Sequence, residues 1–158
     1  GCGEGFVADL IMKRVPGVKL TGFDFNPSSI EMAQKMNPNA EFVTASIFDI
    51  PFPDKSFELV GCFEVLEHQT DPGSALGELA RVSSKSIIIS VPHEPYFCMA
   101  NVARGKNLDI RPRGSDPDHK QFWSRAKFGE FVTTTCPDFK IDWLGGSMPW
   151  TICLASRK

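Results

Sequence analysis

The sequence lacks the features that mark three broad classes of protein. Its five cysteines are scattered and never form a C-x-x-C pair, so neither a disulfide framework nor a zinc knuckle is predicted. No block of lysines or arginines accompanies the formal net charge of -2, which argues against nucleic-acid binding. No apolar run approaches the ~20 residues of a membrane-spanning helix. We therefore expect a reducing, cytoplasmic location, no membrane span and no nucleic-acid partner.

The length of 158 residues and the hydrophobic content of 42% are those of an ordinary globular domain. Neither an internal repeat nor a linker divides the chain. We therefore predict one domain over residues 1–158.

Predicted helices and strands alternate along the chain, which is typical of α/β proteins with a mostly parallel sheet and helices on both faces. The third predicted strand, "FELVGCFE", is apolar nearly throughout, as is a strand covered on both faces. Two runs near the C-terminus, 139–146 and 149–156, predict an antiparallel pair. The predicted helices span 6–15, 27–36, 72–82 and a segment capped by Ser124, and the remaining predicted strands span 18–24, 41–46 and 85–92. Asn37 and Pro38 end the second helix, and the third is predicted to face inward with Ala75, Leu76, Leu79 and Ala80.

Residues 93–122 differ in character from the rest of the chain. The stretch "RGKNLDIRPRGSDPDHK" is irregular and polar and predicts no packed element. A loop of about 30 residues in a compact domain is usually a lid or a mobile segment. We therefore predict a lid or substrate-side insertion within the domain.

The chain begins with a glycine-rich turn that runs directly into a helix. Gly1, Gly3 and Gly5 allow a sharp backbone turn and a close approach to a ligand at the helix N-terminus. The dinucleotide fingerprint G-x-G-x-x-G would need a glycine where this chain has Phe6, which argues against a pyrophosphate ligand. Asp24 ends the next predicted strand, where a carboxylate can accept hydrogen bonds from both ribose hydroxyls.

At this point the sequence resembles a known family. "GCGEG", "TGFDFNPSSIEMAQ", "ASIFDIPFPDKSFELVGCFEVLEH" and "DPGSALGELARV" together resemble the class I S-adenosylmethionine-dependent methyltransferases, especially the small subgroup that includes ubiquinone-biosynthesis-type O-methyltransferases. The resemblance covers roughly residues 1–92 in consistent order. It implies a three-layer Rossmann-like α/β fold, S-adenosylmethionine as cofactor with S-adenosylhomocysteine as product, and methyl transfer to an oxygen, nitrogen or carbon atom of a small molecule.

The same resemblance implies which residues bind the cofactor. The glycine turn would line the methionine moiety, the strand-end aspartate would hold the ribose, and the neighbouring phenylalanine would lie against the adenine. Ser46 and Ile47 would meet the adenine edge, where the family commonly has an acidic residue at the first position. Here that contact would come either from the Ser46 hydroxyl or from Asp49. The implied cofactor-binding residues are Gly1, Cys2, Gly3, Gly5, Asp24, Phe25, Ser46, Ile47, Asp49, Phe63 and Glu64.

Each of these residues also has a structural interpretation. Asp24 could be a turn residue at a strand end, and Asp49 could cap the "IPFPD" turn. Phe25 and Phe63 could belong to the hydrophobic core. These alternatives stay open at the level of the sequence.

Methyl transfer is an in-line displacement on an activated sulfonium, so a base is needed only when the acceptor must lose a proton. His68, His93 and His119 follow predicted strands or lie in the insertion, where an open parallel sheet binds its ligand. We predict His93 as the first candidate base or substrate orienter, with Glu94 beside it and His68 as the second candidate. No two histidines have a recognised ligand spacing, so we expect no metal site.

Aromatic residues near the insertion are candidates for the acceptor pocket. We predict that His119, Trp123 and Tyr96 contact the substrate, although aromatic residues more often serve packing. The expected partner is a small molecule, and the chain is expected to be a monomer or homodimer. Two other functions stay open: a non-catalytic S-adenosylmethionine-binding module, and an oxidoreductase that binds another adenosine cofactor.

In the family, a central strand precedes the glycine turn, and this strand is missing here. We therefore expect an N-terminally truncated domain with a gap of about 9 to 10 Å between "KLTGFD" and "ELVGCF". Unpaired edges at such a gap would favour strand swapping or dimerisation. Direct pairing of these two strands would contradict this expectation.

Overall fold

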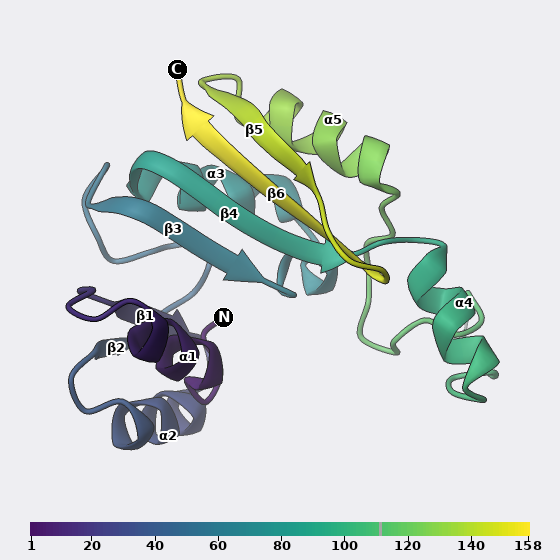
Figure 1. Cartoon of the computed structure of the whole chain (residues 1–158), viewed down its shortest axis with the longest axis horizontal. Coiled ribbons are helices and arrows are strands. Elements are labelled where there is room, and N and C mark those ends of the chain that lie inside the picture. The colour runs from purple at the N-terminus through teal and green to yellow at the C-terminus, as the bar shows by residue number, and fades with distance from the viewer. Residues whose placement is uncertain (111) are drawn as a thin grey trace. The chain divides into compact units, whose positions relative to one another are not determined.

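Two separate sheets organise the chain (Figure 1). The computed structural model describes residues 1–110 and 112–158, which divide into an N-terminal unit, Gly1–Pro51, and a C-terminal unit, Phe52–Lys158. Each unit contains one of the sheets. The single domain and the strand-wide gap stay predictions, while the direct pairing of "KLTGFD" with "ELVGCF" is absent from the described part of the chain.

The N-terminal unit contains a two-stranded parallel sheet and two helices. The sheet pairs Thr21 with Glu41 and Asp24 with Thr44. The second helix begins at Pro27, and the Asn26 side chain caps it by accepting a hydrogen bond from the Ser28 N–H at 3.0 Å. The elements follow the predicted order: α1 (Phe6–Arg14), β1 (Thr21–Asp24), α2 (Pro27–Met36) and β2 (Glu41–Thr44).

The C-terminal unit contains a four-stranded sheet in the order β3-β4-β6-β5. Strand β4 is parallel to β3, whereas β6 is antiparallel to both β4 and β5. Three strands therefore share one direction, and the antiparallel C-terminal strand predicted from the sequence is confirmed. The elements are β3 (Phe57–Phe63), η1 (Leu66–His68), α3 (Pro72–Val82), β4 (Ser83–Pro92), α4 (Tyr96–Ala103), α5 (Arg125–Thr135), β5 (Phe139–Gly145) and β6 (Trp150–Arg157).

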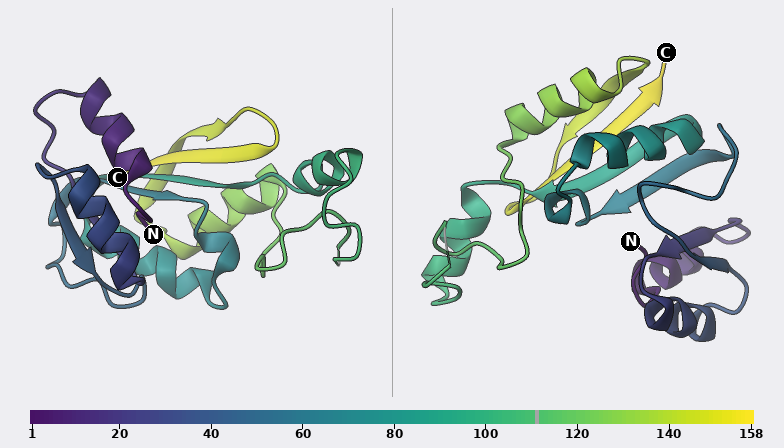
Figure 2. Two further views of the ribbon diagram at one scale, coloured as in Figure 1. Left: turned by 90° about the horizontal axis from the view of Figure 1, so that it is seen from below. Right: turned by 180° about the vertical axis from the view of Figure 1, so that it is seen from behind.

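Helices α3 and α5 pack on the same face of this sheet (Figure 2). The inward residues of α3 are the four that the periodicity predicts, and Val82 joins them. In α5 the Ser124 side chain caps the N-terminus, and Phe128 and Val132 are fully buried. The hydrophobic core of the unit thus lies between these helices and the sheet. The predicted α3 core residues are Ala75, Leu76, Leu79 and Ala80.

The expectation that the third strand is covered on both faces is wrong for this structure. Strand β3 is an edge strand of its sheet and buries Val60 and Cys62 on one face. Leu59 points to the other face and is 58% exposed. Alternating residues of a strand point to opposite faces, so an apolar run does not by itself prove that both faces are covered.

The expectation that residues 93–122 form an irregular loop of about 30 residues is wrong for its first part, because α4 forms there, before the stretch "RGKNLDIRPRGSDPDHK". Its sequence, "YFCMANVA", is apolar and follows Pro95, and the Cys98 N–H donates to the Glu94 carboxylate at 3.3 Å. The polar residues that follow the helix obscured it in the sequence. The role of the segment as a lid stays a prediction.

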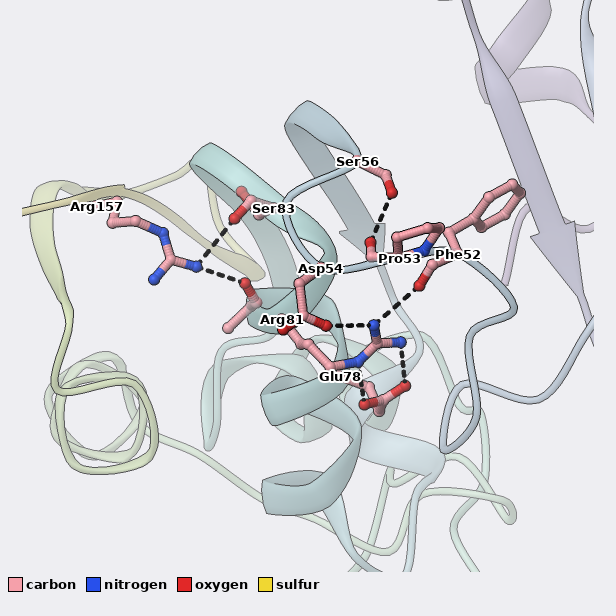
Figure 3. A network of polar contacts seen from close by, with 9 residues as sticks. Phe52, Pro53, Asp54, Ser56, Glu78, Arg81, Ser83 and Arg157 are labelled. Carbon is pink, nitrogen blue, oxygen red and sulfur yellow. Dashed lines mark hydrogen bonds and ion pairs between the residues drawn. The ribbon is translucent and has the colours of Figure 1, made fainter.

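A polar network joins α3 to the segments on either side of it (Figure 3). The Arg81 guanidinium donates to the Phe52 carbonyl oxygen and to Asp54, both at 2.9 Å. Arg157 of β6 donates from Nη2 to the carbonyl oxygens of Ala80 at 2.8 Å and Ser83 at 2.9 Å. These bonds join β6 to the end of α3 and the start of β4, and they add to the bond that the Ser83 N–H donates to the Ala80 carbonyl oxygen.

All five cysteines are free, as expected from their spacing. Among the described helices, none has both the length and the apolar character needed to cross a membrane.

Candidate functional site

In the N-terminal unit, the glycine turn is attached to the end of β1. The Cys2 N–H donates to the Phe23 carbonyl oxygen at 2.8 Å, and the Gly3 N–H donates to Asp24 Oδ2, also at 2.8 Å. The other carboxylate oxygen of Asp24 accepts from the Asn26 N–H at 3.0 Å. Asp24 therefore fixes the turn and the start of α2 together, while each oxygen keeps a second lone pair for a ligand.

Two glycines of the turn have positive φ for different reasons. Gly5 has φ 87°, and a Cβ there would lie 2.7 Å from Asn37 Nδ2 and 3.0 Å from the Ala33 Cα. Gly3 has φ 53°, but a Cβ there would meet nothing within 4 Å. Gly5 is therefore needed for packing against α2, whereas Gly3 faces open space.

The sequence did not identify two residues that shape this turn. Asn37 was seen only as a helix stop, yet its side chain donates to the carbonyl oxygens of Gly5 at 3.1 Å and Ala33 at 3.2 Å. A Cβ at Gly22 would lie 2.7 Å from the Phe42 ring and 3.1 Å from the Cys2 Cβ. Both contacts are long-range, so the local pattern carried no signal for them.

The other predicted cofactor residues of this unit have varied environments. Phe25 is 80% exposed, so the alternative that it belongs to the core is wrong. Ser46 accepts from the Phe48 N–H at 3.2 Å in a short turn. Ile47 is buried and Asp49 is exposed. Asp24, Phe25 and Asp49 thus present side chains that a ligand can reach.

In the C-terminal unit, Glu64 follows β3 with the left-handed φ of 55°. The Ser90 hydroxyl of β4 donates to Glu64 Oε1 at 2.6 Å, and the Glu64 N–H donates to the Ser90 carbonyl oxygen at 3.1 Å. Burial raises the pKa of Glu64, and hydrogen bonds from Ser90 and Trp150 oppose that shift. An unfavourable backbone conformation held by two bonds is typical of a functional position. Phe63, which precedes it, is half-buried.

His93 directly follows β4, and its side chain is partly buried. The backbone N–H of His93 donates to the Pro149 carbonyl oxygen at 2.7 Å. The His93 ring packs edge-to-face on Tyr96, with the ring centroids 4.9 Å apart. Burial first, and then the charge of Arg125, lowers the pKa of His93. A neutral imidazole near pH 7 is the form that accepts a proton.

Glu94 is buried and faces the first turn of α4. Its carboxylate accepts from the Cys98 N–H at 3.3 Å and from the Cys98 thiol at 3.2 Å. Its N–H donates to the Trp123 carbonyl oxygen at 2.8 Å. These bonds give Glu94 a role in holding α4 and the 123 region, and its catalytic role stays a prediction.

His68 and His119 lie side by side although 50 residues separate them in the sequence. Their rings are edge-to-face with centroids 4.9 Å apart, and the His119 ring also lies 5.2 Å from that of Phe97. Burial and the neighbouring His68 lower the pKa of His119. Glu67 lies beside them with a fully buried side chain, and burial raises its pKa to about 8. The sequence did not predict Glu67 because an acid in "EVLEH" resembles any exposed helix residue.

The two aromatic residues predicted to line an acceptor pocket differ in their surroundings. The Trp123 ring lies 5.2 Å from Phe131 and 5.5 Å from the fully buried Phe128, so it packs against α5. Tyr96 is exposed and contacts His93. Tyr96 is therefore the more accessible of the two.

In each unit, some of the predicted site residues lie at the carboxyl ends of parallel strands. In the N-terminal unit the turn, Asp24 and Phe25 come together at the carboxyl end of β1. In the C-terminal unit, Glu64 and His93 follow the neighbouring parallel strands β3 and β4. Ligands of open parallel sheets bind at such carboxyl ends.

Comparison with known proteins identifies the relatives of this chain. Residues 1–89 match the family model of a methyltransferase domain. A Mycobacterium tuberculosis protein named a probable S-adenosylmethionine-dependent methyltransferase is 30% identical over 114 residues, 71% of this chain and 39% of that protein. The ubiquinone biosynthesis O-methyltransferase of Pseudoalteromonas translucida is 30% identical over 137 residues, 80% of this chain and 56% of that protein. The chain therefore spans less than two-thirds of the length of either relative.

Solved structures share the fold. The plantazolicin methyltransferase BpumL, solved with a triazolic desmethylPZN analog and S-adenosylhomocysteine, superposes with a TM-score of 0.81 at 16% identity, covering 100% of this chain and 74% of that one. This likeness confirms the Rossmann-like α/β fold expected from the sequence. The family match covers more than half of the chain, and the chain therefore belongs to the methyltransferase domain family.

Proposed function

We propose that the chain is an S-adenosylmethionine-dependent methyltransferase that acts on an oxygen, nitrogen or carbon atom of a small molecule. The single observation that carries this proposal is the arrangement of Asp24, whose two carboxylate oxygens hold the Gly3 and Asn26 N–H groups at 2.8 and 3.0 Å. It places an anionic acceptor at a glycine turn with open space above Gly3. This geometry suits a ribose with two neighbouring hydroxyls.

The residues of the chain fit such a cofactor in three respects. Asp24 would accept from the ribose hydroxyls, the exposed Phe25 ring would stack on the adenine, and Gly3 would allow the methionine end to approach the backbone. The cofactor supplies an activated methyl group when bound. The protein has to align the acceptor with it and exclude water.

His93 is the proposed base for acceptors that must lose a proton. Its lowered pKa keeps the ring neutral near pH 7, and its place after β4 is where a parallel sheet binds ligands. A ring nitrogen of His93 would take the acceptor proton as the methyl group transfers. Tyr96, in contact with His93, would orient the acceptor.

A labelled-methyl assay tests the proposal. The chain is incubated with S-adenosylmethionine labelled in its methyl group and with a panel of phenols, amines and activated carbon acids. We expect label in at least one acceptor together with an equal amount of S-adenosylhomocysteine. Asp24→Asn should reduce kcat/KM for the cofactor by about 10-fold or more, since a charge-assisted bond contributes about 1.5–3 kcal/mol.

Glu31→Gln is the matched control because it removes one exposed negative charge from the same unit, on α2. It should leave the rate within about two-fold of wild type. Cofactor binding without transfer to any acceptor would favour a non-catalytic binding module. Reduction of NAD by a substrate, without binding of the sulfur ligands, would support an oxidoreductase and reject the proposal.

A further inference from the structure

One cluster of potential metal ligands combines Glu67, which the sequence did not predict, with two of the predicted site histidines. Glu67 and His68 belong to η1, the short helix after β3, and His119 comes from the segment between α4 and α5. One donor atom from each of the three lies within 4.8 Å of the others. All three residues belong to the C-terminal unit.

The backbone holds the two parts of the cluster together independently of these side chains. The N–H groups of Lys120 and Gln121 both donate to the Glu67 carbonyl oxygen, at 2.8 and 3.0 Å. The Gln121 side chain also donates to the Gln69 carbonyl oxygen at 3.0 Å. Lys120 and Gln121 therefore hold the neighbouring His119 beside η1 through backbone contacts, and not through the His119 side chain alone.

Glu67 is the unusual member of the cluster. Its side chain is 1% exposed, and neither carboxylate oxygen has a hydrogen-bond partner among the residues that the structure describes. A buried carboxylate without hydrogen bonds carries a large desolvation cost, and such groups are rare unless they pair with a charge or bind a metal. His68 Nε2 lies 3.9 Å from Glu67 Oε1, which is too far for a hydrogen bond.

The two imidazoles are also suited to ligate an ion. His68 Nδ1 lies 3.2 Å from the Asp118 carbonyl oxygen, so a proton on Nδ1 leaves Nε2 free and directed to the side of Glu67. A backbone carbonyl that fixes a histidine tautomer in this way is a common second partner of metal ligands. His119 Nδ1 is buried and has no hydrogen-bond partner within the described part of the chain.

We propose that Glu67, His68 and His119 bind one divalent transition-metal ion of the zinc class. The ligands would be one carboxylate oxygen and two imidazole nitrogens, a set that prefers zinc, cobalt or nickel to magnesium or calcium. Ligand atoms around a tetrahedral zinc lie roughly 3.4 Å apart, given bonds of about 2.0–2.2 Å. The three ligand atoms, now up to 4.8 Å apart, would move closer together when the ion binds.

Binding has two consequences for the protein. The ion would neutralise the buried Glu67 carboxylate, and it would join η1 to the segment that carries His119. Three protein ligands also leave a fourth coordination position for water or another ligand. The geometry of Glu67, His68 and His119 stands apart from Asp24, Phe25 and Gly3, which are proposed to bind the cofactor.

Metal titration of the whole chain tests the site. After removal of metal with a chelator, Co²⁺ is added and its visible absorption bands are followed, and Zn²⁺ affinity is measured by competition with a chromophoric chelator. We expect one ion per chain, tetrahedral Co²⁺ bands and a rise in the thermal unfolding midpoint with Zn²⁺. A large excess of Mg²⁺ should not displace the Zn²⁺.

Glu67→Gln and His119→Gln should each weaken Zn²⁺ binding by more than about 100-fold, the upper end of the loss seen when only a supporting partner of a ligand is removed. His93→Gln is the matched control because it removes the third histidine and leaves the cluster intact, and its Zn²⁺ affinity should stay within about two-fold. Circular dichroism verifies that each variant is folded. If Glu67→Gln or His119→Gln does not fold, His68→Gln takes its place as the ligand variant. Wild type without bound Zn²⁺, equal affinity in the ligand variants, or equal loss in His93→Gln would each overturn the proposal.

Discussion

The Asn37 side chain donates a hydrogen bond to the Gly5 carbonyl oxygen at 3.1 Å, while a Cβ at Gly5 would lie only 2.7 Å from the same nitrogen. The bond ties the glycine turn to the end of α2, and the close approach requires a glycine at this position. This pair of residues determines the conformation of the turn that we propose to bind the cofactor.

Gly5→Ala should therefore destabilise the N-terminal unit and weaken cofactor binding together. The loss in the free energy of unfolding has two parts. A residue with a Cβ in the left-handed conformation costs about 1–2 kcal/mol, and the displacement of the Asn37 side chain adds a further penalty. Gly17→Ala is the control because Gly17 has a similar φ of 82° but open space around it. Urea unfolding should show the larger loss for Gly5→Ala, and equal losses would contradict the importance of the contact with Asn37.

Gly3→Ala should separate binding from folding in the same turn. Gly3 has positive φ, and nothing lies within 4 Å of a Cβ built there. We expect a stability loss of about 1–2 kcal/mol from the backbone conformation alone. Calorimetry should nevertheless show a loss of S-adenosylhomocysteine affinity of about 10-fold or more, since the new methyl group would occupy the space of the ligand. Unchanged affinity would show that the ligand does not approach Gly3.

His93 should control the acid limb of the pH profile. Burial and the charge of Arg125 lower its pKa, so kcat/KM for an acceptor that loses a proton should rise with a midpoint below about 6.5. Arg125→Gln removes one cause of the lowered pKa and should move the midpoint up. The unfolded chain binds this proton more readily, so stability also falls as the pH drops from about 6.5 through the folded-state pKa. An acid limb that persists in His93→Gln would assign the base to another residue.

Arg157→Met should destabilise the C-terminal unit by about 2–3 kcal/mol, because hydrogen bonds from a charged group contribute about 1.5–3 kcal/mol. The substitution removes both bonds to the carbonyl oxygens of Ala80 and Ser83, and the stacking on Phe139 at 4.6 Å. Lys85→Met is the control, since Lys85 pairs with Glu58 at an exposed position and should contribute less than about 1 kcal/mol. Thermal or urea unfolding measures both, and equal effects would contradict the structural role of Arg157.

Local patterns predicted much of this fold. The Pro72–Val82 helix has the predicted ends and the predicted inward face, since both depend on nearby residues: a proline at the start and apolar side chains every three or four positions. The apolar run of α4 was missed because its polar neighbours dominated the pattern around it. The sequence of β3 has apolar residues on both faces, so it could not predict which face of the strand is exposed.

The sequence predicted the parts of the candidate sites that short motifs define. It did not predict the parts that depend on contacts between residues far apart in the chain. The glycine turn and Asp24 were visible in sequence because their spacing is short and their order is characteristic. Asn37 meets Gly5, and Glu67 meets His119, only in the folded chain. The residues next to Asn37 and Glu67 in the sequence give no sign of these contacts. The proposed metal site in particular needs a buried carboxylate, and burial is a property of the tertiary structure.

Calorimetric titration of the chain with S-adenosylmethionine and S-adenosylhomocysteine, beside NAD, is the most direct test of the account. We expect S-adenosylmethionine and S-adenosylhomocysteine each to bind one per chain and NAD not to bind. Asp24→Asn should weaken the binding of both sulfur ligands by about 10-fold or more, while Glu31→Gln should not. Tighter binding of NAD, or no binding of either sulfur ligand, would contradict it.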